Sequence, residues 1–88
     1  MNFTTEDFNG HSIHVVGVGE NCYIYCNFLM REQQAFFDAM ERCFGEDMYR
    51  VQQDKGETII SVHRTMDGAD FMDKVNEIFY DNVRGDWV

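Results

Sequence analysis

The stretch "CYIYCNFL", residues 22–29, decides how the rest of the chain is interpreted. It is rich in aromatic and branched apolar residues, which is typical of a β-strand, and alternate side chains of a strand point to opposite faces of the sheet. One face would carry two thiols and two large apolar groups, and the other would carry two tyrosines. The first set is Cys22, Ile24, Cys26 and Phe28, and the second is Tyr23 and Tyr25.

We expect the face with the thiols to be buried. Small thiols and aliphatic groups bury easily, whereas a tyrosine hydroxyl prefers water. Tyr23 and Tyr25 would then lie on an open face of the sheet, near His14 and one of Ile59 or Ile60.

Two hairpins can be recognised around this strand. "SIHVVGV" (12–18) precedes it, and the short "GEN" segment between the two strands is typical of a tight turn. Further along, "MYRVQQ" (48–53) and "ETIISVHR" (57–64) flank the turn "DKG" (54–56). The chain therefore predicts four strands in two hairpins.

Each hairpin is followed by a segment with helical periodicity. In 29–45 the apolar residues recur at helical spacing, and Gly45 is a natural residue to end the helix. After the second hairpin, Thr65 or Asp67 can cap a helix that stops near Gly85. The apolar positions are Phe36, Phe37, Met40, Cys43 and Phe44 in the first helix, and Phe71, Met72, Val75, Ile78, Phe79 and Val83 in the second.

The element order is ββαββα after a short N-terminal segment. We expect one domain, residues 1–88, of the α+β class, with a four-stranded, mainly antiparallel sheet and two helices packed on one face. A shift of 35 residues aligns the two halves weakly, with Phe36 on Phe71 and Asp38 on Asp73. A tandem ββα repeat over 11–45 and 46–85 is one explanation, and the shared apolar pattern of two amphipathic helices is the other.

The charge balance limits the classes of partner. Asp and Glu number 16 against 7 Lys and Arg, so the formal net charge is −9. Direct binding of nucleic acid or of an anionic membrane needs cationic surface, so the composition favours a basic protein partner instead. The N-terminus does not resemble a signal peptide, and no segment has the roughly 18 apolar residues of a membrane span. Three cysteines without a pairing pattern suit a reducing compartment, so we expect a cytoplasmic protein.

The sequence indicates no catalytic residues, metal or cofactor. Cys22 and Cys26 have half of a zinc-site spacing, but in one strand they would lie about 13 Å apart, and no second ligand pair follows. No cysteine has a histidine placed near it by local structure, as a nucleophile would require. We therefore expect a protein that is not an enzyme.

The segment "TMDGADFMDKVNEIFYD" (65–81) carries the most distinctive charge pattern. On a helix its carboxylates fall within an arc of about 120° and extend about 21 Å, opposite the apolar side. Lys74 alone interrupts them and could pair in part with Asp70 or Asp81. We call this set the acidic column: Asp67, Asp70, Asp73, Glu77 and Asp81.

Two functional hypotheses remain, beside the possibility that the column only keeps the helix solvated. In the first, the column, extended by Glu41, Glu46 and Asp47, covers the basic surface of a nucleic-acid-handling protein and inhibits or regulates it. Such nucleic-acid mimicry would suit a phage or mobile-element protein acting in the host cytoplasm. In the second, an adaptor or structural module dimerises or docks through an open sheet face that carries His14, Tyr23 and Tyr25.

Overall fold

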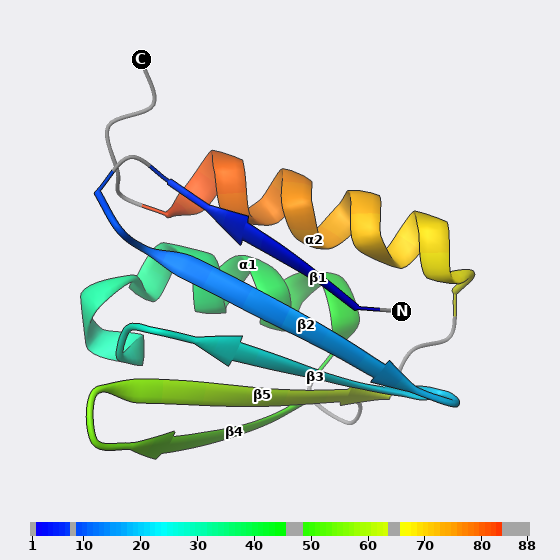
Figure 1. Cartoon of the computed structure of the whole chain (residues 1–88), viewed down its shortest axis with the longest axis horizontal. Coiled ribbons are helices and arrows are strands. Elements are labelled where there is room, and N and C mark those ends of the chain that lie inside the picture. The colour runs from blue at the N-terminus through cyan, green and yellow to red at the C-terminus, as the bar shows by residue number, and fades with distance from the viewer. Residues whose placement is uncertain (1, 8, 46–48, 64–65, 84–88) are drawn as a thin grey trace.

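The computed structural model describes residues 2–7, 9–45, 49–63 and 66–83, and within them the chain forms a five-stranded sheet and two α-helices (Figure 1). The strand order is β1-β2-β3-β5-β4, and every neighbouring pair is antiparallel. The elements are β1 (Asn2–Glu6), β2 (Ser12–Val18), β3 (Asn21–Cys26), a short 3₁₀ turn η1 (Met30–Glu32), α1 (Gln34–Phe44), β4 (Tyr49–Asp54), β5 (Glu57–His63) and α2 (Gly68–Asn82).

The α+β class, the antiparallel sheet and the two helices are confirmed, but the expected number of four strands is wrong. The N-terminal segment forms β1 and pairs with residues 12–16 of β2. Phe3 lies opposite Val15 and Thr5 opposite Ile13, so this strand adds a half-buried ring and a buried threonine to the core side of the sheet. The Thr5 hydroxyl also donates a hydrogen bond to the side-chain oxygen of Asn76 in α2. A strand with only one large apolar residue is hard to recognise from the sequence. In the structure β1 pairs with the edge of β2 that β3 leaves open.

The predicted faces of β3 are confirmed. Its residues alternate strictly between exposed and buried, with Cys22, Ile24 and Cys26 inside. The same alternation continues in β5, where Ile60 and Val62 are buried and Ile59 is only partly covered. In Figure 1 both helices lie behind the sheet, on the side to which these buried residues belong.

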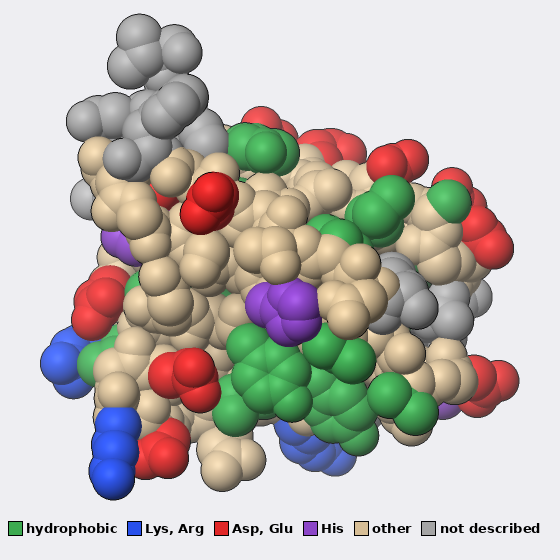
Figure 2. All heavy atoms as spheres, in the orientation of Figure 1, with side chains coloured by type: hydrophobic (Ala, Val, Ile, Leu, Met, Phe, Trp, Pro, Cys, Tyr) green, Lys and Arg blue, Asp and Glu red, His purple; other side chains and the backbone are tan. Residues whose placement is uncertain are grey.

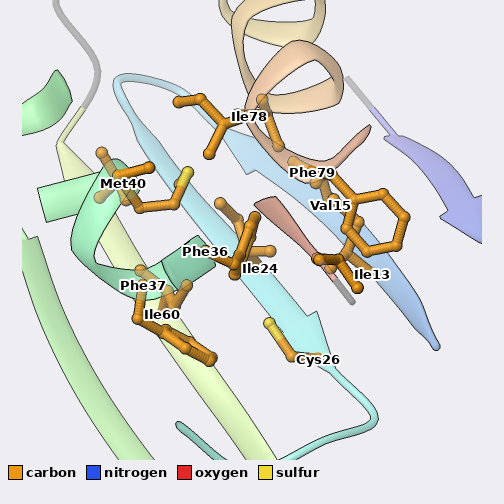
Figure 3. Close-up of a cluster of buried hydrophobic side chains, with 14 of the residues drawn as sticks. Ile13, Val15, Ile24, Cys26, Phe36, Phe37, Met40, Ile60, Ile78 and Phe79 are labelled. Atoms are coloured by element: carbon orange, nitrogen blue, oxygen red, sulfur yellow. The ribbon is translucent and has the colours of Figure 1, made fainter. Parts of the chain in front are cut away.

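The core joins the inner side of the sheet to both helices. The aromatic rings of Phe28, Phe36 and Phe37 meet edge to face with centroids 5.2–5.9 Å apart, a geometry that aromatic quadrupoles favour. Phe36 also contacts Phe79 of α2 at 6.0 Å. Figure 3 shows strand residues Ile13, Val15, Ile24, Cys26 and Ile60 facing Phe36, Phe37 and Met40 of α1 and Ile78 and Phe79 of α2.

Two details of α1 differ from expectation. The helix begins at Gln34, and the residues before it form η1, so the helical segment is shorter than the stretch 29–45. Cys43 is exposed, although the apolar spacing placed it on the inner side. The predicted end at Gly45 is confirmed, since this glycine has a φ of 83° and its amide donates to the carbonyl of Glu41.

Candidate functional site

Helix α2 positions the acidic column, and the first residue of the column also caps the helix. Asp67 is the N-cap, as the sequence predicted: its carboxylate accepts a hydrogen bond from the amide of Ala69 at 3.1 Å. Asp70 follows in the first turn, where the helix dipole stabilises negative charge. The alternative cap, Thr65, and the expected stop at Gly85 lie outside the described residues.

The two sides of α2 differ as the periodicity predicted. Phe71, Val75, Ile78 and Phe79 are buried in the core, while all five residues of the acidic column are exposed. In Figure 2, acidic side chains line the edge of the molecule that α2 forms. The helix thus holds the carboxylates away from the core on a rigid, packed element.

The column is poorly compensated. Lys74 lies 3.8 Å from Glu77, so the expected pairing with Asp70 or Asp81 is wrong. Among the residues that the structure describes, none forms an ion pair with Asp70, Asp73 or Asp81. Neighbouring residues of the column are separated by about 4.5–6 Å along the helix axis, which is less than the Debye length of about 8 Å in physiological salt. Their mutual repulsion is therefore only partly screened.

The secondary acidic residues are only partly placed. Glu41 is exposed near the C-terminal end of α1. The two helices run antiparallel, since Phe36 contacts Phe79 and Phe44 contacts Phe71. Glu41 is therefore level, along the axis, with the N-terminal half of α2. Glu46 and Asp47 lie outside the described residues.

The alternative site residues share the exposed face of the sheet. His14 in β2 is directly opposite Tyr25 in β3, with ring centroids 6.5 Å apart, and Tyr23 follows two residues along. The His14 ring is held by the Thr4 hydroxyl at 2.7 Å. Figure 2 shows hydrophobic side chains gathered beside a histidine over the middle of the sheet. The structure thus brings these three residues together, on elements other than the helix that carries the acidic column.

One cluster was missed by the sequence analysis. Asp7, in the β1–β2 turn, has a fully buried side chain, which accepts hydrogen bonds from the amides of Asn9 and His11 at 2.9 and 2.8 Å and pairs with the His11 ring at 2.8 Å. The other ring nitrogen of His11 lies 3.1 Å from the side-chain nitrogen of buried Gln33. An aspartate two residues before a turn Asn-Gly was the available signal, because such residues commonly accept from the amides that follow.

These contacts set the charge state of Asp7. Burial, the largest single influence, raises its pKa, but the hydrogen bonds from the His11 ring and from the amides of His11 and Asn9, with the positive charge of His11, outweigh burial. The pKa of Asp7 is therefore lowered from its ordinary value of 3.8. This acid is one of the 16 counted in the net charge, but its buried carboxylate stabilises the turn.

The two cysteines of β3 are shielded from solvent. Cys22 and Cys26 are buried, and burial, followed by the negative charge of Glu57, raises the pKa of the Cys26 thiol far above its ordinary value of 9.0. Within the described ranges, no three His, Cys, Asp or Glu side chains are grouped closely enough to hold a metal ion.

Comparison of the chain with protein-family models, curated proteins and solved structures finds no match. No helix in the described part of the chain is long and apolar enough to cross a membrane.

Proposed function

We propose that this protein is a small, non-enzymatic binding protein that inhibits or regulates a nucleic-acid-handling protein by occupying its basic surface with helix α2. The observation that carries the proposal is the exposure of Asp70, Asp73 and Asp81 along one side of α2, with no ion-pair partner among the described residues. The overall charge of −9 adds to the negative potential around the helix.

The physical basis is the resemblance between a carboxylate column and a nucleic-acid strand. A cleft that binds nucleic acid is lined with cations, and its occupation releases counterions and gains from long-range attraction. A packed helix holds the backbone of the column at fixed spacing, so only the side chains need ordering when they bind. The required properties are density and spacing of charge rather than a motif.

The contacts within the column support a narrower choice of binding residues. One carboxylate oxygen of Asp67 accepts a hydrogen bond from the Ala69 amide, and the charge of Glu77 is partly neutralised by Lys74. We therefore assign most of the binding to Asp70, Asp73 and Asp81, whose charges are not satisfied by described neighbours. Glu41 can extend the contact if the partner also covers α1.

The test is affinity capture from lysate of cells that naturally produce the protein, with three tagged forms. The column variant carries Asp70→Asn, Asp73→Asn and Asp81→Asn. The control variant removes the same amount of charge from exposed acids on other elements, through Glu32→Gln, Asp54→Asn and Glu57→Gln. Both changes are nearly isosteric, so each variant should keep the fold.

We expect the wild type and the control variant to retain the same partner, and duplex DNA or RNA added to the beads to release it. The column variant should retain little of it. Equal loss from both variants would show that only net charge matters. Equal retention by all three forms, or a partner that nucleic acid does not displace, would refute the proposal.

A further inference from the structure

The exposed face of the sheet is organised in two central rows that cross all five strands. The strand register places one residue from each strand in each row. Row one is Thr4, His14, Tyr25, Ile59 and Gln52, and row two is Asn2, Val16, Tyr23, Ser61 and Arg50.

Neither row contains an acidic residue, in a chain where 16 of 88 residues are acidic. At the centre of the face lie Tyr23 and Tyr25, with relative exposures of 36% and 39%, beside the partly exposed Val16 and Ile59. The patch in Figure 2 is the visible part of this area. The most apolar part of this surface therefore lacks the acidic side chains that would repel another acidic protein. Charged residues are depleted in the same way at the centre of protein interfaces.

The charges flanking the rows are unequal at the two ends. Beyond row one lie the acidic residues Glu6, Asp54 and Glu57, with Lys55 in the adjoining turn. Beyond row two lies His63, which is 3.8 Å from Glu20. Among the described residues, the second end carries one acid, Glu20, and the first carries three.

We propose that this face binds a second copy of the chain in a symmetric dimer. The two-fold axis lies parallel to the face, perpendicular to the strands and midway between the two rows. This axis places row one of each copy over row two of the other, so that Tyr25 packs on Tyr23 of the second copy. It also brings the end of each face with more acids over the end with fewer, as counted in the described residues, and places Glu57 opposite His63. A two-fold axis parallel to the strands would instead place Glu6 over Asp54, which repel.

The available area makes this a weak dimer. Five strands about 4.8 Å apart and six residues of about 3.3 Å give a face of roughly 480 Å² per copy. That is below the roughly 800 Å² per partner of stable complexes, and is typical of concentration-dependent association. Because each copy carries a charge of −9, screening of their overall repulsion should strengthen the dimer as salt rises. Binding through the acidic column should respond to salt in the opposite direction.

The test is sedimentation equilibrium of the purified chain from about 10 μM to about 1 mM, at low and high salt. We expect the average mass to rise from 10.4 kDa toward twice that value, and to rise further in high salt. Tyr23→Thr with Tyr25→Thr, which keeps β-propensity, should remain monomeric throughout. Tyr80→Thr, at a tyrosine on α2 that is more exposed than these two, should dimerise like the wild type.

The axis is tested by exchanging the facing charges. His63→Glu alone should weaken the dimer by facing Glu57 with another acid, and the double exchange adds Glu57→Lys to it. The double exchange should restore association to within a few fold of the wild type. A wild type that stays monomeric at 1 mM (about the highest practical concentration) would overturn the proposal. So would loss of the dimer in Tyr80→Thr together with its survival in the Tyr23 and Tyr25 variant.

Discussion

Replacement of Asp7 by Asn tests how the β1–β2 hairpin is stabilised. The side chain of Asp7 is fully buried, and both of its oxygens are in use: one accepts two backbone amides and the other meets the His11 ring. Asparagine keeps one acceptor oxygen for the two amides, but it removes the charge and turns an NH₂ group toward His11. The substitution therefore isolates the contribution of the carboxylate charge.

The expected loss follows from those three contacts. Hydrogen bonds to a charged group contribute about 1.5–3 kcal/mol each, against about 1 kcal/mol for neutral ones. The smaller cost of burying a neutral amide offsets part of the difference. We expect Asp7→Asn to lower the free energy of unfolding by about 2 kcal/mol at neutral pH, measured by urea denaturation. Asp54→Asn, at an exposed position, should change it by less than about 0.5 kcal/mol.

The pH dependence gives a second readout. Because the pKa of Asp7 is lower in the folded protein than its ordinary value of 3.8, its contribution is complete above that value and is lost as pH falls through the folded pKa. The gap between wild type and Asp7→Asn should therefore shrink on acidification below about pH 4. A gap that is absent at neutral pH, or that stays constant into acid, would refute this account of the turn.

Three further predictions concern the helices and the core. Asp67→Ala should cost about 1 kcal/mol of stability in urea denaturation and Asp67→Ser much less, since serine also caps a helix; equal losses would contradict the capping role. Phe36→Ala should cost about 3–5 kcal/mol by the same method, because this ring is fully buried among three others. Iodoacetamide should label Cys43 in the native protein and spare Cys22 and Cys26 until the chain unfolds, as mass spectrometry would show.

Much of the fold could be predicted because its signals are local. Alternation of thiols and tyrosines identifies the buried side of β3, and a glycine at position 45 ends α1. The position of β1 depends instead on its pairing with β2, and its residues Asn2–Glu6 contain one large apolar side chain. No periodicity in five such residues distinguishes a strand from an acidic tail.

The candidate sites were predictable to a similar extent. Helical spacing places the acidic column on one side of α2, but whether Lys74 pairs with Asp70, Glu77 or Asp81 depends on side-chain conformation. The buried state of Asp7 could not be inferred from composition, because its partners are backbone amides, and the residue beyond His11 in the same network is the distant Gln33. From the net charge alone, Asp7 would be taken for an exposed acid.

The central claim is that Asp70, Asp73 and Asp81 bind a basic partner as a nucleic-acid strand would. The most direct test is the slope of log affinity against log salt for the captured partner, measured for the wild type, the column variant and the control variant. We expect a steep decrease with salt for the wild type, and a shallower slope with about tenfold weaker binding at low salt for the column variant. The control variant should follow the wild type. A column variant with the wild-type slope and affinity would contradict the claim.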